Sequence, residues 1–337
     1  MSKTDRIRLS DVAALAGVSR AAVGKVLNGG SPRICVSSKT HERILEAAKK
    51  LNYRPNMAAS ILAGGDSRLI GIIVDSHASY YTFRLHQEIE RLCSEQGYRL
   101  ISILVHDNIA NMREDYLRLQ GYGVNKFICC AHDYPQYQNE IIELFSGVRD
   151  VVFMGKPPVP DMPYVQTSQT KALSAMIKDA LQKGYRRIGM FTGYLYWQSE
   201  QFLYREFEEA MRQNGLEPDL RLTAQYKEEL SLQEQIDHVM ETVIDPYRPD
   251  FLFLHDAVHA ASLQFRLLER GIRIGICGGN NNPLFSGLGL SSLDPCYERI
   301  AQSLLDLLIK KTDQKKMFLV EAEYKGAIYP EKLPVKK

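Results

Sequence analysis

Residues Leu9–Asn28 read LSDVAALAGVSRAAVGKVLN, and this stretch decides the fold of the N-terminal part of the chain. Ser10 is expected to cap a short helix over Asp11–Ala16, because a serine hydroxyl accepts a hydrogen bond from the free amides of a helix N-terminus. Gly17 is expected to end that helix, and Ser19 to cap a second one. The stretch therefore predicts two short helices joined by a tight turn.

The apolar residues of both helices recur at helical spacing, so each helix has one face suited to a core. They are Val12, Ala13, Leu15 and Ala16 in the first helix and Ala22, Val23, Val26 and Leu27 in the second. The outward face of the second helix is small and basic, with Arg20, Ala21, Gly24 and Lys25. Such a pair is typical of a helix-turn-helix, whose second helix enters the major groove of DNA. On periodicity alone, a plain helical hairpin is the alternative.

A third helix is expected to complete this N-terminal head. Ser37 or Ser38 can cap it, and it runs to about Leu51. The residues expected to pack back on the first two helices are Ile44, Leu45, Ala48 and Leu51. A three-helix head buries little, so its core needs several residues together, namely Val12, Val23, Val26, Ile44 and Leu51.

The segment after the head is short and is bounded by helix breakers. Pro55 ends the third helix, and Gly64-Gly65 stops the next one. Residues Met57–Ala63 can form barely two helical turns between them. A helix of this length is marginal in isolation, and an interdomain linker is the alternative.

From Arg68 onward, apolar segments of strand length alternate with amphipathic helices. The strands are expected at 69–75, 98–105, 126–131, 148–155, 186–193, 222–225 and 250–256, and the helices at 84–96, 112–121, 171–183, 201–214, 232–244 and up to Arg270. This alternation predicts parallel sheets that are covered by helices on both faces. A body of about 270 residues needs two such sheets, and ligands then bind at the carboxyl ends of the strands, between the lobes.

Charge is distributed unevenly along the 337 residues, whose net charge is +2. Residues 1–65 contain eleven Lys or Arg and four Asp or Glu, which gives +7 and leaves −5 for the remainder. A basic N-terminal head on a mildly acidic body is the pattern of a phosphate-binding domain joined to a domain that binds something else. A solvated basic face is the alternative.

The N-terminal stretch resembles the signature of the LacI/GalR family of bacterial transcription regulators, DVAxxAGVSxxTVSRVLN. DVA, AGVS, V and VLN stand intact, and residues 37–56, SSKTHERILEAAKKLNYRPN, are similar to the family pattern SxxTRxxIxxAxxxLxYxPN. The body resembles the family's effector domain in KGYRRIGMFTG (183–193), LERGIRI (268–274) and SSLDP (291–295). The resemblance implies an all-α helix-turn-helix head with a hinge helix, followed by an α/β two-lobed, periplasmic-binding-protein-like effector domain with parallel sheets.

The resemblance also implies domain boundaries and a function. The DNA-binding head is expected over residues 1–55, the hinge helix and linker over 56–67, and the effector-binding and dimerisation domain over 68–337. Its N-lobe would comprise about 68–165 and 292–320, and its C-lobe about 166–291 and 321–337. The implied protein is a dimeric repressor that binds a near-palindromic double-stranded operator and responds to a small effector, a sugar or sugar derivative. A transcriptional activator is the alternative, as is a cytoplasmic solute-binding or sensor protein with an impaired head.

The residues that match the family's DNA-binding positions extend from the first helix to the hinge, where Leu62 would enter the minor groove. They are Ser10, Ser19, Arg20, Ala21, Lys25, Asn28, Arg33, Tyr53, Asn56, Ala59 and Leu62. Three positions depart from the family, because Ala22 replaces Thr, Gly24 replaces Ser and Lys25 replaces Arg. The first two changes remove hydroxyls that could contact phosphates, and lysine lacks the two-pronged fork that reads guanine.

The effector positions depart more strongly from the family. Leu203 stands where relatives carry an arginine, and Arg205 follows two residues later. Carboxylates that are common in the family appear here as Asn280 and Ser168. The expected effector-binding residues are Ser76, Tyr81, Ser168, Trp197, Arg205, Asp256 and Asn280. Trp197, the sole tryptophan, could stack on a sugar or base face or pack one lobe against the other.

Other classes of function find little support in the sequence. There is no GxSxG elbow, Walker sequence or complete dinucleotide fingerprint, so an enzyme is not expected, and no cofactor is implied. His255 and His259 lie four residues apart but lack the glutamate and third ligand of a metal site, which favours a structural role and no metal. The six cysteines contain no CxxC pair and are expected to be buried thiols. The chain has no leader and no run of eighteen apolar residues, so a cytoplasmic protein is expected.

Overall fold

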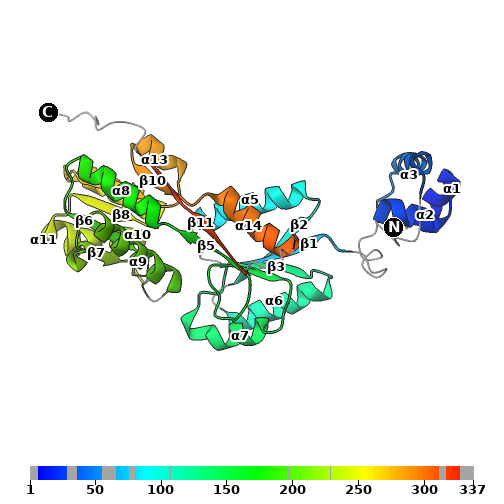
Figure 1. The fold of residues 1–337 in the computed structure, drawn as a ribbon, viewed down its shortest axis with the longest axis horizontal. Helices are drawn as coiled ribbons and strands as arrows, with labels where there is room; N and C mark the ends of the chain where they lie inside the picture. Colours follow the sequence, from blue (N-terminus) through cyan, green and yellow to red (C-terminus); the bar gives the residue numbers. More distant parts are fainter. Residues whose placement is uncertain are drawn as a thin grey trace. The chain divides into compact units, whose positions relative to one another are not determined.

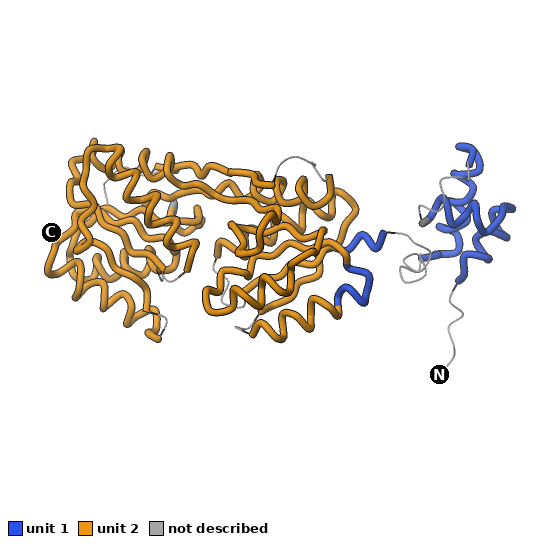
Figure 2. Tube along the Cα trace, turned by 60° about the horizontal axis from the view of Figure 1, so that its bottom comes forward, with its two compact units in different colours: residues 1–69, 119–124 blue, residues 70–118, 125–337 orange. Residues whose placement is uncertain are grey.

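The chain contains two compact units, each with its own hydrophobic core (Figure 2). One unit comprises residues 1–69 and 119–124, and the other comprises 70–118 and 125–337. The computed structural model describes residues 7–28, 36–54, 66–75, 80–105, 108–193, 195, 197–227, 229–310 and 316–326, without the side chains of residues 28, 286 and 287. In these described ranges, no helix is long and apolar enough to cross a membrane.

The head contains the three helices that the sequence predicts, α1 (Leu9–Ala16), α2 (Arg20–Asn28) and α3 (Ser38–Lys50) (Figure 1). Two of the predicted caps are confirmed, because the Ser19 hydroxyl accepts the amide of Ala22 at 3.2 Å and the Ser37 hydroxyl accepts that of Thr40 at 3.3 Å.

The predicted cap of α1 is wrong. Ser10 lies inside that helix, which begins one residue earlier. The Asp11 carboxylate accepts the amide of Arg8 at 2.7 Å and so satisfies the helix start that Ser10 was expected to serve.

The core of the head is small and apolar. Val12, Val23 and Ile44 are fully buried, and the smaller residues Ala13, Ala16, Ala47 and Ala48 complete the cluster. Val26 and Leu51 pack against its rim. Two predicted core residues are wrong, because Leu15 is 52% exposed and Leu45 is 45% exposed. Each lies on the outer face of a helix whose inner face is already filled by one branched residue and two alanines.

The first lobe of the body is built on a six-stranded sheet in the order β11-β5-β4-β3-β1-β2 (Figure 1). The pairs β1–β3, β3–β4, β4–β5 and β5–β11 are parallel, with Ile72 opposite Ile128 and Ile128 opposite Val152. The strands of this sheet are β1 (Leu69–Asp75), β2 (Arg99–Val105), β3 (Lys126–Cys129), β4 (Val151–Met154), β5 (Tyr164–Ser168) and β11 (Met317–Glu321).

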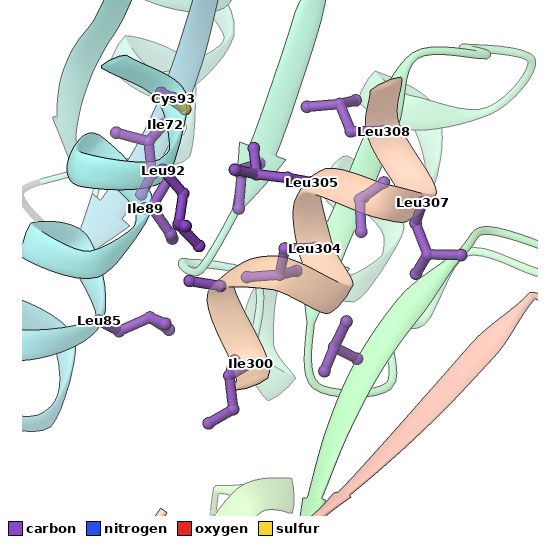
Figure 3. Packing of buried hydrophobic residues seen from close by; sticks show 14 of the residues in the cluster. Ile72, Leu85, Ile89, Leu92, Cys93, Ile300, Leu304, Leu305, Leu307 and Leu308 are labelled. Carbon is purple, nitrogen blue, oxygen red and sulfur yellow. The ribbon is translucent and has the colours of Figure 1, made fainter. Parts of the chain in front are cut away.

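Helices cover both faces of this sheet. On one face, α5 (Tyr80–Glu95) packs beside α14 (Tyr297–Leu305), and their leucines and isoleucines meet over β1, β3 and β4 (Figure 3). On the other face, α6 (Ile109–Gly121) and α7 (Gln138–Phe145) contribute Tyr116 and Phe145, whose rings pack on Phe127 and Phe153. Because both faces are covered there, the central strands β1, β3 and β4 are buried and apolar along most of their length, as the sequence predicts.

The second lobe contains a six-stranded sheet in the order β12-β10-β9-β8-β6-β7, parallel except for the edge pair β10–β12. Its strands are β6 (Ile188–Thr192), β7 (Thr223–Gln225), β8 (Phe251–Leu254), β9 (Gly275–Gly278), β10 (Ser291–Asp294) and β12 (Glu323–Lys325). One face is covered by α8 (Thr170–Gln182) and α9 (Gln198–Gln213), and the other by α10 (Leu232–Val239), α12 (Ala257–Glu269) and α13 (Pro283–Leu288).

The chain crosses between the lobes after β5, after β10 and after β11. These crossings place residues 166–168 in the first sheet and 292–294 in the second, about three residues beyond the boundaries expected from the sequence. The expected helix over 232–244 is not α-helical throughout. The α-helical part, α10, ends at Val239, and a π-helical turn over Met240–Ile244 connects it to α11 (Asp245–Tyr247). Strands β5, β9, β10, β11 and β12 and helices α7 and α13 were not predicted. Most of them are too short to show a periodicity.

Candidate nucleic-acid interface and ligand cleft

Helix α2 presents the N-terminal part of its basic face to solvent. Arg20 and Ala21 are exposed, whereas Gly24 and Lys25 are partly buried. Ser19, predicted to contact DNA, uses its hydroxyl as the helix cap and stays at the exposed N-terminal end. The N-terminal residues of a recognition helix are those that reach base edges, so this arrangement suits entry into a major groove.

The turn before α2 is fixed by a residue that the sequence did not single out. Gly17 has a left-handed φ of 63°, and Val18 donates its amide to Ala13 at 3.1 Å. From α3, the Arg43 guanidinium donates to the carbonyl of Ala16, and its Nη2 lies 3.5 Å from that of Gly17. A cation at the C-terminal end of a helix satisfies its last carbonyls and its dipole. Arg43 therefore ties α3 to the turn that orients α2.

Replacing Arg43 with methionine is expected to loosen this turn. Methionine keeps an apolar stem but has no donor, and losing a charged hydrogen bond to partly exposed carbonyls costs about 1–2 kcal/mol. Hydrogen exchange of the amides of residues 9–28 in the full chain should be correspondingly faster. Lys39→Met is the matched control, because Lys39 is an exposed cation on the same helix. Equal exchange in the two variants would remove Arg43 from this role.

The other predicted DNA-binding residues lie at different places in the head or outside the described residues. Ser10 is exposed and lies beside Asp11, and Tyr53 packs at the rim of the head core. Asn28 is the last residue of α2. Four predicted residues, Arg33, Asn56, Ala59 and Leu62, lie outside the described residues.

At the carboxyl ends of the strands, the two lobes contact each other through an aspartate. Asp133 follows β3 in the first lobe, and its carboxylate accepts the amides of Gln198 at 3.0 Å and Ser199 at 2.9 Å. It also accepts the Ser199 hydroxyl at 2.8 Å. Both of these partners lie in the first turn of α9, in the second lobe. The carboxylate thus joins the lobes across the predicted cleft.

Trp197 takes part in the same contact. Its ring centroid lies 5.7 Å from that of Tyr134, with the planes at 70°, which is an edge-to-face pair. Tyr134 is buried and donates its hydroxyl to the Asp75 carboxylate at the end of β1. Trp197 therefore packs one lobe against the other, which was one of its two expected roles. Stacking of its ring on an effector stays a prediction.

Glu200, in the first turn of α9, forms a carboxylate–imidazole pair with His255. Glu200 accepts the Thr192 hydroxyl at 2.6 Å and the amide of Gly193 at 3.1 Å, and it lies 2.8 Å from Nδ1 of His255. Burial alone would raise the pKa of Glu200 and lower that of His255. Their mutual attraction and hydrogen bond outweigh burial, so the pKa of Glu200 is lowered and that of His255 is raised.

Asp256 and His259 form a second pair at the start of α12. The Asp256 carboxylate caps the helix through the amides of Val258 and His259, and it lies 2.9 Å from Nδ1 of His259. Burial would raise the pKa of Asp256, but the bonds from His259 and the backbone lower it. His259 Nε2 bonds Gln235, and its ring stacks on Tyr226 with centroids 3.9 Å apart.

The two histidines of the candidate metal pair are therefore bonded separately. His255 takes Glu200, and His259 takes Asp256 and Gln235. Within the described residues, no group of three potential metal ligands comes together. The five described cysteines, Cys93, Cys129, Cys130, Cys277 and Cys296, are free thiols, of which Cys130 and Cys296 are only partly buried.

The remaining predicted effector residues are bonded to the protein itself. Tyr81 packs on the first-lobe core, its hydroxyl lies 3.8 Å from the sulfur of Met154, and burial raises its pKa. Ser168 donates to the buried Glu206 at 2.6 Å. Arg205 is exposed and donates to the Gln201 carbonyl of its own helix at 3.2 Å. Ser76 lies outside the described residues.

Asn280 sits where the lobes meet near α14. It is buried with a left-handed φ of 68°, its carbonyl accepts the Tyr297 hydroxyl at 2.9 Å, and its amide lies 3.4 Å from the His255 carbonyl. Leu203, at the family's arginine position, is buried in the second-lobe core. The second lobe therefore keeps no charge at that position.

The structure thus brings Trp197 close to residues that sequence reasoning missed, namely Asp75, Asp133 and Tyr134. Asp75 is the last residue of one predicted apolar strand, and Asp133 lies two residues after another. This position was the available signal, because polar residues at the carboxyl ends of strands face the cleft. A separate cavity of about 470 Å³ lies along the edge strand β7 and is lined by residues such as Arg221, Tyr226 and Thr242. None of the predicted effector residues lines it.

Comparisons with known proteins match both parts of the chain. A model of the lacI family of bacterial regulatory proteins matches residues 8–56, and a periplasmic binding protein-like domain matches residues 177–319. Over 315 residues, the chain is 24% identical to the HTH-type transcriptional repressor PurR of Histophilus somni (strain 129Pt), which covers 91% of this chain and 92% of that protein.

Two solved structures share the fold over nearly the whole chain. The transcriptional regulator CelR-cellobiose complex has a TM-score of 0.65 at 19% identity and covers 96% of this chain and 99% of that chain. The Lac repressor dimer bound to operator and the anti-inducer ONPF has a TM-score of 0.75 at 20% identity, with coverages of 96% and 98%. The predicted head and two-lobed body are thereby confirmed: the head matches the lacI family of bacterial regulatory proteins, and the body matches a periplasmic binding protein-like domain.

Proposed function

We propose that this protein represses transcription by binding a near-palindromic operator as a dimer, under the control of a small effector bound between its lobes. The observation that carries the proposal is the exposed N-terminal end of α2, with Arg20 and Ala21, on a head whose charge is opposite to that of the body. Relatives and neighbours include transcriptional repressors and an operator complex, which supports the same function. An enzymatic activity has no support from any of them.

On the DNA, we propose that Arg20, Ala21 and Lys25 face bases. Ser10, Ser19, Asn28, Arg33, Tyr53 and Asn56 would contact or position the backbone. Beyond the described residues, Leu62 would enter the minor groove, and Ala59 would allow two hinge helices to approach each other. Formation of the short hinge helix on the operator would couple the state of the lobes to the state of the head.

The dimer is proposed to form through exposed apolar residues on both lobes. On α12, the inner face is buried, yet Val258, Phe265 and Leu268 are 47–58% exposed, and Leu284 on the adjoining α13 is 62% exposed. On the first lobe, Phe83 of α5 and Leu104 of the edge strand β2 are also exposed. Apolar side chains that gather in this way on a soluble protein mark an interface, and an uncovered edge strand invites pairing.

The effector is proposed to be a sugar or a sugar derivative. The solved neighbour in complex with cellobiose supports this class. Ser76, Tyr81, Ser168, Trp197, Arg205, Asp256 and Asn280 remain the proposed binding residues. A thermal-shift screen of sugars and nucleosides against the purified protein would identify it, because a ligand that binds only the folded state raises its melting temperature.

Replacing Lys25 with alanine tests the DNA-binding function. Because Lys25 lies on the face of α2 proposed to meet bases, the variant should lose about 1–3 kcal/mol of affinity for the operator and much less for random DNA. Fluorescence anisotropy with operator and scrambled duplexes at one fixed salt concentration measures both losses. Lys39→Ala, on α3, is the control. If the wild-type protein binds palindromic and scrambled duplexes equally, with or without effector, the proposed function fails.

A further inference from the structure

We propose that Asp133 closes the cleft from within. Its carboxylate occupies the N-terminus of α9, where the acidic group of a ligand would otherwise bind. The lobes therefore close without an effector, and the part of the effector that faces α9 is uncharged. The second half of this inference rests on the proposed function, whereas the closure itself does not.

Helix α9 depends on this carboxylate because its own sequence supplies no cap. The N-cap residue is Trp197, whose side chain makes no capping hydrogen bond, and an indole has no acceptor to offer. The first amides of a helix have no partner within the helix and lie at the positive end of its dipole. An aspartate from the other lobe satisfies two of these amides, those of Gln198 and Ser199.

Both carboxylate oxygens of Asp133 are engaged. One accepts the amide of Gln198, and the other accepts both the amide and the hydroxyl of Ser199, with all three distances between 2.8 and 3.0 Å. Charge-assisted bonds of this length are about twice as strong as neutral ones. Since the donors and the acceptor belong to different lobes, opening the cleft breaks all three together.

The neighbouring residue strengthens the same contact. Tyr134 packs edge-to-face on Trp197 and donates its hydroxyl to Asp75, so the loop after β3 is attached to the second lobe and to the end of β1. This contact therefore combines a polar cap with an apolar packing interaction. We call it the latch, and it comprises Asp133, Tyr134, Trp197, Gln198 and Ser199. Asn280 adds a second link between the lobes through the Tyr297 hydroxyl.

The charges around the latch disfavour an anion. Asp75 and Asp133 both place carboxylates at this edge, and the nearby His255 and His259 are each bonded to a carboxylate of their own. A helix N-terminus is an anion-binding site, but here the protein's own anion fills it. A sugar phosphate or a sugar acid would have to displace Asp133 and then lie beside its charge.

Trp197 allows the latch to be tested directly, because it is the sole tryptophan of the chain. Asp133→Ala, without ligand, should shift Trp197 emission to longer wavelength and increase its quenching by acrylamide, as the ratio of closed to open molecules falls by roughly tenfold. Asp133→Asn should lie between this variant and the wild type, since its amide oxygen replaces only part of the carboxylate. Asp219→Ala is the control, because Asp219 accepts the amide of Arg221 at the start of another short helix in the second lobe.

Rescue by a small anion distinguishes the loss of the Asp133 carboxylate from a nonspecific destabilisation of the protein by the substitution. Formate, at constant ionic strength in sodium chloride, should restore wild-type emission and raise the melting temperature of Asp133→Ala, and should leave the wild type and Asp219→Ala unchanged. The inference is overturned if Asp133→Ala shows wild-type emission and quenching, or if its altered emission does not respond to formate. It is also overturned if formate or phosphate stabilises the wild type equally.

Operator binding, measured on the same preparations, keeps this result apart from the proposed function. A wild type that binds its operator while Asp133→Ala shows no change in emission refutes the latch alone. A wild type that cannot distinguish operator from random DNA refutes the repressor function, and the Trp197 measurements still decide whether Asp133 closes the cleft.

Discussion

Replacing Glu200 with leucine is expected to reduce the free energy of unfolding of the body by about 3 kcal/mol, because removing one partner of a buried ion pair leaves the other uncompensated. The side chain of Glu200 is 13% exposed and that of His255 is 27% exposed. The variant also leaves the Thr192 hydroxyl and the amide of Gly193 without their acceptor. Several donors therefore lose one shared partner.

The pair should also make stability depend on pH in a bounded window. The pKa of Glu200 is lowered from its ordinary value of 4.5, so its contribution is present above that value and is lost as the pH falls through the lowered pKa. The pKa of His255 is raised from 6.5, so its contribution is present below that value and is lost as the pH rises through the raised pKa. The difference between wild type and Glu200→Leu should therefore be largest between about pH 4.5 and 6.5.

Chemical denaturation of the full chain at pH 5.5 and at pH 9 measures this difference. Glu209→Leu is the matched control, because Glu209 is exposed on the same helix and bonds only Gln213 among the contacts described. It should change stability by at most about 0.5 kcal/mol. In the double variant Glu200→Leu/His255→Leu, part of the loss should be recovered, since no charge is then left uncompensated. Losses that simply add would show that the two residues are not coupled.

Local patterns in the sequence were sufficient to predict much of this molecule. The caps at Ser19 and Ser37, the αL glycine at Gly17 and the alternation of strands and helices all depend on residues a few positions apart. Periodicity alone could not tell which apolar residues of a short helix face inward. Leu15 and Leu45 therefore proved exposed, since one branched residue and two alanines fill the inner face of each helix.

The candidate cleft was harder to predict because its contacts join distant segments. Asp133 and Ser199 meet only after two sheets have folded, and so do Glu200 and His255. The family's arginine position is likewise uninformative here, because Leu203 is buried and Glu206 turns toward Ser168. What the sequence does show is that Asp75 ends one apolar strand and that Asp133 lies in the loop just after another, which places both carboxylates at the carboxyl edge of the sheet.

Phe265→Glu is expected to separate the proposed dimer and reduce operator affinity by a factor of about 100 or more. A dimer binds two half-sites, so its second head binds at a high effective concentration, and a monomer loses this gain. Phe265 is 58% exposed in the middle of the apolar surface of α12, between Val258 and Leu268. A carboxylate there would be desolvated by the partner without a counter-charge.

Analytical ultracentrifugation and operator titrations on the same samples measure both effects. Leu220→Glu is the matched control, because Leu220 is 70% exposed but lies on the short helix before β7 and not on α12 or α13. It should leave both mass and affinity unchanged. If Phe265→Glu remains dimeric, the surface of α12 is not the interface. If it is monomeric and still binds the operator as tightly as the wild type, operator recognition does not depend on two linked heads, since avidity is lost whenever the second head is not held nearby.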